Sequence, residues 1–268
     1  MQPGTAMLGL ALAALVAEPA RAQILSNPTQ WYIDTQMYST RVFTDMVANS
    51  MITGRTGTRA KASAPNAPAA ADPTQFREAA SASMARTLAV RTRGSVEQRD
   101  ETRRLLDSYV ALYKQTAETD GFPSNDLAYA FEYFVVNNYH IYHDLMSVPY
   151  GKDPRAKRGV DGFDRIRIMN EKKLLQITMP QERAIYEQFR ASLGANPEVG
   201  RMTDVQKQET AEQMAIMFGV NYAAYMRAID AGSDQAVEQA HQMARQGLEK
   251  LLGVPVTSIR VTSAGLER

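Results

Sequence analysis

A succession of helix start and stop signals most constrains what this chain can fold into. Ser95-Val96-Glu97-Gln98 has the form of a capping box, in which Ser and Gln side chains bond free backbone N–H groups at a helix start. The residues that follow place an apolar stripe on one face of a helix, formed by Leu105, Leu106, Tyr109, Leu112 and Tyr113. Gly121 can adopt the left-handed conformation that ends a helix. The sequence therefore predicts a helix over about 95–121.

The same kinds of signal recur along the rest of the chain. They predict further helices over about 125–146, 163–175, 180–193, 204–231 and 233–252. Gly253 and Pro255 stop the last of these in the order that is typical of a helix end. The series contains no run of alternating strands and no repeat of fixed period. We therefore expect an all-α fold, an irregular multi-helix bundle.

The end of the chain departs from this helical pattern. Ile259-Arg260-Val261-Thr262 alternates like a strand, yet a lone strand is not stable without a partner. We expect a short extended C-terminal tail that docks on the helices, with residues 165–168 as a candidate neighbour.

An export signal is predicted over residues 1–22. Ala6 to Val16 form an apolar run of suitable length, and Ala20 and Ala22 supply small side chains before Gln23. The run departs from the usual pattern because no Lys or Arg precedes it. An uncleaved membrane anchor is the alternative, but this run is short for a membrane span. We expect cleavage after Ala22 and a periplasmic or secreted mature protein.

Two segments separate this signal from the main domain. Residues 23–52 carry aromatic and aliphatic side chains at three- and four-residue spacings, which predicts an amphipathic N-terminal helix. Residues 53–72 are rich in Ala, Pro, Gly and Thr and have too few apolar side chains to offset the entropy of ordering, so we expect a disordered linker. The linker is long enough for the N-terminal helix to fold back onto the predicted helical domain, residues 73–268.

Charge and cysteine content exclude several function classes. The 268 residues contain 30 Lys and Arg and 29 Asp and Glu, a net charge of +1, whereas nucleic-acid binding needs a basic excess. A chain without cysteine has no disulfide, no thiolate metal site and no cysteine nucleophile. The sequence also lacks a Gly-rich phosphate loop and a Gly-x-Ser-x-Gly elbow. We expect no nucleic-acid partner and no cofactor.

Short motifs in the two halves of the main domain resemble a known family. The first is Asp126-Leu127-Ala128-Tyr129-Ala130, followed by an aromatic helix. The second begins with Met202-Thr203-Asp204-Val205-Gln206-Lys207-Gln208 and continues through Leu252-Gly253 to residues 261–266. Over roughly residues 89–266 the chain resembles a family of exported bacterial helical proteins known as a domain of unknown function. The resemblance implies an exported helical domain and no particular activity, because the family has no established catalytic residues.

The predicted helix 125–146 carries the candidate functional residues. Leu127, Phe131 and Phe134 share a face that we expect to point into the core. The opposite face is aromatic and polar, so either a second layer of helices covers it or it stays open to a partner or ligand. The candidate binding surface on that face is formed by Tyr129, Tyr133, Tyr139, His140 and His143. Asn138 falls on the core face, where its amide needs a buried partner.

Four residues of the same helix could share a metal ion, namely Glu132, His140, His143 and Asp144. The His-x-x-His spacing sets two imidazoles about one turn apart, and imidazole with carboxylate suits zinc or iron. The chain lacks His-Glu-x-x-His and the second Glu-x-x-His helix of di-iron bundles. Histidines that are exposed or hydrogen-bonded explain the spacing equally well, so both interpretations stay open.

Two other segments have both a structural and a functional interpretation. Residues 152–173 contain eight Lys and Arg and four Asp and Glu, a net +4, which could contact phospholipid headgroups or an acidic partner or be a solvated face. The helix 204–231 carries a stripe that is typical of core but could line an apolar ligand groove, formed by Met214, Phe218, Tyr222, Tyr225 and Ile229. Gly219 within that helix predicts a close helix contact or a bend.

These observations predict an exported helical protein that acts by binding, as an accessory or interaction protein, without catalysis. Its partner would be a protein or a small apolar ligand, with a weak contact to a membrane surface as a further possibility. Two alternatives stay open: a carrier of small apolar ligands, and an enzyme that uses carboxylate and imidazole groups near His140.

Overall fold

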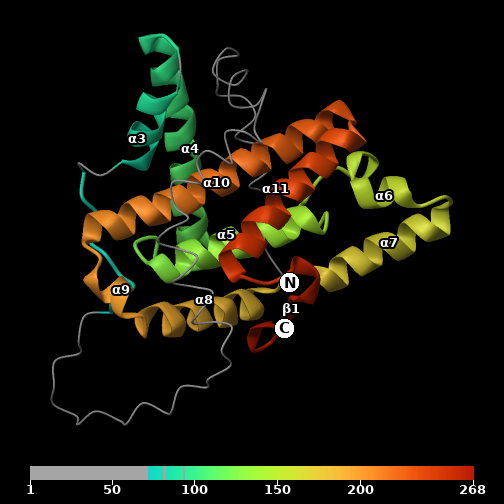
Figure 1. Cartoon of the computed structure of the whole chain (residues 1–268). Helices are drawn as coiled ribbons and strands as arrows, with labels where there is room; N and C mark the ends of the chain where they lie inside the picture. Colours follow the sequence, from blue (N-terminus) through green and yellow to red (C-terminus); the bar gives the residue numbers. More distant parts are fainter. Residues whose placement is uncertain (1–71, 81–82, 93) are drawn as a thin grey trace.

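The computed structural model of the chain describes residues 72–80, 83–92 and 94–268, and helices dominate it (Figure 1). The all-α prediction is confirmed. The predicted export signal, the amphipathic helix 23–52 and the linker up to residue 71 lie outside the described residues. Among the helices described, none has the length and apolar character needed to cross a membrane.

The described helices are α3 (Met84–Arg91), α4 (Val96–Asp120), α5 (Leu127–Tyr142), α6 (Pro154–Arg158), α7 (Gly162–Leu175), α8 (Met179–Gly194), α9 (Pro197–Arg201), α10 (Asp204–Ala231) and α11 (Asp234–Leu252). Two 3-10 turns, η1 (Tyr150–Lys152) and η2 (Val256–Ser258), and two short strands, β1 (Arg260–Thr262) and β2 (Gly265–Glu267), complete the described elements. The short helices α3, α6 and α9 were not predicted from the sequence.

Local capping explains why the long helices begin and end where they do. The predicted box at Ser95 and Gln98 is present, and Gly121 ends α4 in the left-handed conformation with φ of 72°. Thr203 and Gln206 form another capping box at α10. Gly253 closes α11 in the same left-handed way. Each of these signals acts within about one turn, so the sequence alone predicts it.

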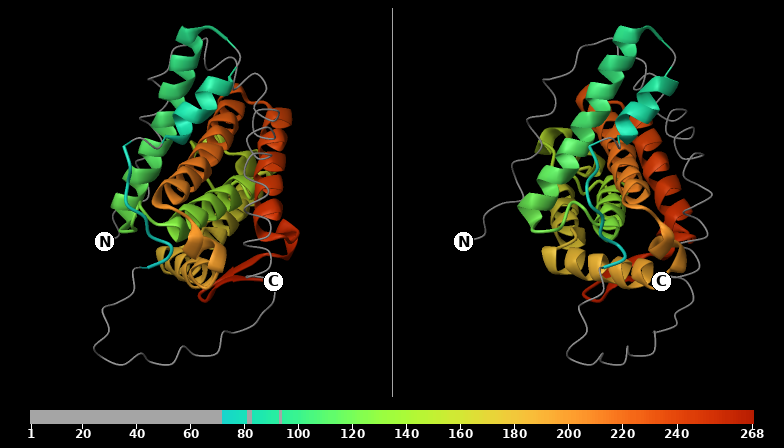
Figure 2. Two further views of the ribbon diagram at one scale, coloured as in Figure 1. Left: turned by 60° about the vertical axis from the view of Figure 1, so that its left-hand side comes forward. Right: turned by 90° about the vertical axis from the view of Figure 1, so that its left-hand side faces the viewer.

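Helix α5 is the centre of the bundle. It packs against α8, α10 and α11, and Figure 2 shows it enclosed between these helices. Because apolar side chains lie all round it, such a helix is stable only when it is covered on every side. Asn138 is fully buried there, and its side-chain oxygen accepts a hydrogen bond from Asn221 of α10 at 2.8 Å. The predicted buried partner of Asn138 is thus found.

Helix α10 supplies the largest neighbouring surface. Its predicted apolar stripe packs in the core, with Tyr222 only partly buried, so the core interpretation is confirmed. A Cβ placed on Gly219 would lie 2.3 Å from Cγ of Tyr109 in α4, which shows why this position has no side chain. The close helix contact predicted at Gly219 is therefore confirmed.

The C-terminal tail folds back on itself. β1 and β2 pair antiparallel, with Val261 opposite Leu266, and the hairpin lies against α8. The Gln188 side chain holds it there, accepting from the Leu266 N–H at 2.8 Å and donating to the Leu266 carbonyl at 3.0 Å. The expected neighbour was wrong, because residues 165–168 belong to helix α7 and the strand finds its partner within the tail.

Candidate functional site

The aromatic face of α5, the candidate binding surface, is covered by neighbouring helices. Tyr129 is 1% exposed and Tyr133 is 3% exposed. The ring of Tyr113 from α4 lies 5.2 Å from both of their rings, and Phe218 from α10 lies 5.1 Å from Tyr133. The second layer therefore exists, and the expectation of an open Tyr face is corrected: these two rings pack in the core.

The histidine end of the same face is more accessible but still enclosed. Tyr139 is buried and packs against the half-buried His143, with ring centroids 4.3 Å apart and the rings tilted. Nε2 of His140 accepts a hydrogen bond from the Ile177 N–H at 3.3 Å. Burial lowers the pKa of both His140 and His143 to about 4, so both imidazoles are neutral at pH 7.

The four candidate metal ligands do not assemble. Among the described residues, no three His, Asp or Glu side chains are placed so that they could hold a metal ion. Glu132 instead lies among other carboxyl groups: burial raises its pKa, and the nearby Glu182 and Asp120 raise it further. The shared site of Glu132, His140, His143 and Asp144 is therefore corrected, because the turn at the end of α5 sends Asp144 to different partners.

Asp144 is the centre of a polar cluster where α5 ends. It is 1% exposed, and its backbone adopts the left-handed region with φ of 53°. Its Oδ1 accepts a hydrogen bond from the Tyr225 hydroxyl at 3.0 Å and lies 2.7 Å from Nε2 of His241. Its Oδ2 accepts from Arg158 at 2.8 Å. One carboxylate thus joins α5, α6, α10 and α11.

The contact between Asp144 and His241 was not predicted from the sequence. Nδ1 of His241 lies 3.6 Å from the Glu238 carboxylate, so both ring nitrogens face acidic groups. A carboxylate that orients an imidazole is also the geometry of general-base pairs. Here the same carboxylate is already shared with Tyr225 and Arg158, which makes it a structural tie between helices.

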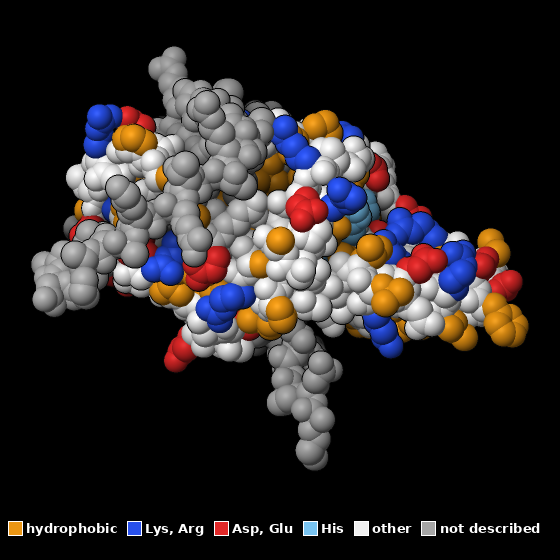
Figure 3. Space-filling view, turned by 90° about the horizontal axis from the view of Figure 1, so that it is seen from below, with side chains coloured by type: hydrophobic (Ala, Val, Ile, Leu, Met, Phe, Trp, Pro, Cys, Tyr) orange, Lys and Arg blue, Asp and Glu red, His pale blue; other side chains and the backbone are white. Residues whose placement is uncertain are grey.

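Of the residues that the structure describes, the most exposed apolar ones lie on a projecting segment, residues 149–175, which we call the arm. It contains η1, α6 and α7 and extends away from the bundle (Figure 1). Phe163 is 87% exposed, Val160 is 86% exposed and Leu174 is 85% exposed. Figure 3 shows hydrophobic and charged side chains gathered on this projection. The basic charge of this segment was predicted from the sequence, whereas its exposed apolar residues were not.

A few polar contacts hold the arm to the bundle. Lys172, the one buried residue of α7, forms an ion pair with the buried Asp153 and donates to the Met146 carbonyl at 2.7 Å. Nε of Arg155 donates to the His143 carbonyl at 2.8 Å. The arm is therefore anchored along its inner side while its outer side stays free of described contacts with the bundle.

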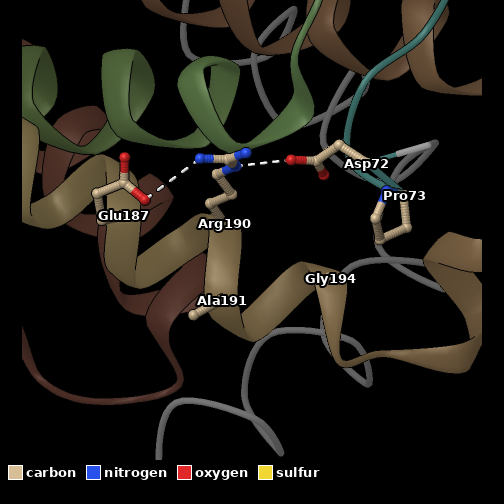
Figure 4. Close-up of a pocket in the computed structure, with 6 residues that line it drawn as sticks. All are labelled: Asp72, Pro73, Glu187, Arg190, Ala191 and Gly194. Carbon is tan, nitrogen blue, oxygen red and sulfur yellow. Dashed lines mark hydrogen bonds and ion pairs between the residues drawn. The ribbon is translucent and has the colours of Figure 1, made fainter. Parts of the chain in front are cut away.

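A shallow depression lies elsewhere, where the described chain begins beside α8 (Figure 4). Arg190 lines this depression, and its guanidinium donates to Asp72 at 2.6 Å and lies 3.6 Å from the Glu187 carboxylate. Pro73, Ala191 and Gly194 form the rest of its lining. Because its one cation is already shared between two carboxylates, we assign no ligand to it.

Comparison with known families decides where this chain belongs. A family described as a family of unknown function, DUF6683, matches residues 1–148 and 176–268. The chain belongs to this family. The resemblance to a domain of unknown function is thereby confirmed, while export and a bacterial source stay proposals. No curated protein and no solved structure matches the chain. The DUF6683 match leaves out residues 149–175, so the arm falls between its two matched parts.

Proposed function

We propose that this DUF6683 protein is an exported binding or accessory protein that contacts its partner through the arm. The observation that carries the proposal is the set of large apolar side chains left exposed on one projecting helix. Contiguous exposed apolar residues rimmed by polar ones are typical of interaction sites in soluble proteins. On the arm they stand beside basic residues such as Arg165 and Lys173.

Two serine variants test this function: a double variant of the arm and a single variant elsewhere as the control. The arm variant replaces Phe163 and Leu174 by Ser, and the control replaces Val96, which is 64% exposed on α4, by Ser. Tagged full-length proteins would be incubated with a detergent-free envelope extract of the producing cell. We expect the wild type and the Val96→Ser control to retain the same material and the arm variant to lose it. Equal retention by all three proteins would contradict the proposal.

Export is the second part of the proposal. It is supported by the apolar run from Ala6 to Val16 and the small residues Ala20 and Ala22. N-terminal sequencing of the mature protein should begin at Gln23. Recovery of a membrane-bound protein that retains Met1 would overturn this part.

A further inference from the structure

The outer side of α7 carries a definite apolar stripe. Phe163, Ile166 and Leu174 recur at spacings that place them within about 80° of one another on a helix. All three are exposed, whereas Lys172 on the opposite side is buried. Exposed apolar side chains with basic residues on either side, here Arg167 and Lys173, are one feature of helices that lie in a membrane interface.

We propose that this outer face of α7 docks on an anionic phospholipid bilayer. The inference rests on the proposed function, because it takes the arm as the contact site and names what the arm contacts. In the docked state Phe163 and Leu174 enter the boundary between headgroups and acyl chains, and the basic residues remain at the headgroups.

Charge on the arm favours an anionic surface. Its four acidic residues already have partners within the arm: Asp153 pairs with Lys172, Asp164 and Glu171 pair with Arg167, and Asp161 caps α7. Three exposed basic residues have no ion-pair partner among the residues that the structure describes, namely Lys157, Arg165 and Lys173. At 100° per residue Lys173 flanks the apolar stripe, whereas Arg165 lies on the side of Lys172 and Lys157 belongs to α6. The arm as a whole therefore presents uncompensated positive charge, and each such charge that reaches the lipid surface strengthens attachment to anionic lipid.

The size and shape of the face favour a bilayer over a folded protein. A helix of 14 residues is about 21 Å long and about 10 Å wide, which gives a contact face of roughly 200 Å². A stable protein interface buries about 800 Å² on each partner. A bilayer has no such requirement, because it accepts single side chains into its interface. Figure 3 shows the arm projecting from the body, where a flat surface can reach it.

A fluorescent label on the outer face tests the proposal directly. Since the chain has no cysteine, Asn170→Cys gives one labelling site between the apolar residues, and Gln235→Cys on α11 gives a matched exposed control. Each full-length protein carries an environment-sensitive dye and is mixed with phosphatidylglycerol-containing vesicles or with pure phosphatidylcholine vesicles. We expect the dye at position 170 to shift to the blue with anionic vesicles alone, and the dye at position 235 to stay unchanged.

Two sets of variants separate the apolar and charged contributions. Phe163→Ser should weaken vesicle binding about tenfold. Neutralising Lys157, Arg165 and Lys173 to Gln should weaken it roughly 100-fold at low salt. The controls Val96→Ser and Arg86→Gln with Arg245→Gln should bind like the wild type, and circular dichroism would verify that every variant is folded.

Three outcomes would overturn the inference. A dye at position 170 that is already shielded in buffer means that another part of this chain or a second copy covers the face. A dye that stays exposed with anionic vesicles means that the face does not bind lipid. Equal binding to both vesicle types means that charge plays no part. If one of these three outcomes is found while the arm variant still loses its bound material in the extract, the proposed function stands and the lipid partner is rejected.

Discussion

At the scale of single residues, the surroundings of each carboxyl group determine whether its ionised form stabilises the folded protein. Burial alone would raise the pKa of Asp144, but His241, Arg158 and Tyr225 outweigh burial and hold that pKa below its ordinary value. Near α8 the balance is reversed. Burial raises the pKa of Glu182 to about 7, and the charge of Asp120 adds to this effect. An ionised carboxylate therefore stabilises the folded protein at Asp144 and destabilises it at Glu182.

Asp144→Asn should lower the free energy of unfolding by about 3 kcal/mol, because it leaves His241 and Arg158 without their shared carboxylate. Asn tolerates the left-handed backbone at this position, so the change tests charge rather than strain. Urea denaturation at pH 7 measures the loss. The control is Asp230→Asn, which breaks an exposed ion pair with Lys152 and should lower the free energy of unfolding by less than about 1 kcal/mol.

Because the folded pKa is lowered, the stability due to Asp144 is present above pH 3.8 and is lost as the pH falls through the folded value. An unchanged unfolding midpoint at pH 7 would contradict the proposed tie.

Glu182→Gln should stabilise the protein by about 1–2 kcal/mol at pH 8 and leave it unchanged at pH 4. The folded pKa is raised from 4.5 to about 7, so the neutral carboxyl is fully tolerated below pH 4.5 and stability falls as the pH rises through 7. Urea midpoints of the wild type and the variant across pH 4–8 measure the difference. Glu187→Gln, at an exposed position of the same helix, is the control and should change stability by less than about 1 kcal/mol. A constant difference between wild type and Glu182→Gln would show that this group does not titrate as described.

At the scale of elements, α5 shows how a helix with two different faces can be buried on both. On one face Phe131 packs against Phe189 of α8, and the tyrosine face meets rings from α4 and α10. α7 is the opposite case, since its outer face has no described neighbour at all. Periodicity alone predicts a helix in both segments, but only packing distinguishes a core face from an exposed one.

Tyr133→Ala should cost about 3–5 kcal/mol, because it removes a ring that packs between α4 and α10. Tyr150→Ala is the matched control, since that ring is 52% exposed and its loss should cost under about 0.5 kcal/mol. Thermal and urea unfolding measure both changes. Near-wild-type stability of Tyr133→Ala would return the tyrosine face to the list of candidate binding surfaces.

Gly219→Ala should destabilise the protein by about 1–2 kcal/mol, although alanine favours helix over glycine by about 1 kcal/mol. The new methyl would meet the buried ring of Tyr109 at 2.3 Å, and the free-energy cost of displacing this ring exceeds the gain in helix propensity. In Gly200→Ala the methyl meets nothing within 4 Å, so this variant should be as stable as the wild type or slightly more so. Chemical denaturation of the pair isolates the cost of the contact, and a stabilised Gly219→Ala would exclude it.

At the scale of the whole molecule, the chain divides into a packed bundle and the arm. The core is formed almost entirely by residues outside 149–175, and Ala156 is the arm's one buried apolar residue. Where the arm leaves and rejoins the bundle, the Gln176 side chain donates to the Leu145 carbonyl at 3.3 Å. A short linker can therefore connect the two ends.

Replacement of residues 149–175 by a short Gly-Ser linker should leave a cooperatively folded bundle, less stable by about 1–2 kcal/mol. The deletion removes both Lys172 and Asp153, so neither remains as an unpaired buried charge. The main loss is the contact of Arg158 with Asp144. Circular dichroism and urea unfolding measure the result, and vesicle binding by the same protein should be absent. A variant that fails to unfold cooperatively would show that the arm is part of the core.

The sequence by itself determined the helical class, the capped helix ends and the basic charge of residues 152–173, because these depend on residues within about one turn or on composition. Only the tertiary structure decided which faces are covered. The contact between Asp144 and His241 joins residues 97 positions apart, and the cover over Tyr129 and Tyr133 comes from other helices. No local pattern carries such information, since burial is a property of the helices that meet and not of one helix. For the same reason the exposed stripe of α7 and the core stripe of α10 look alike in sequence and differ only in what packs against them.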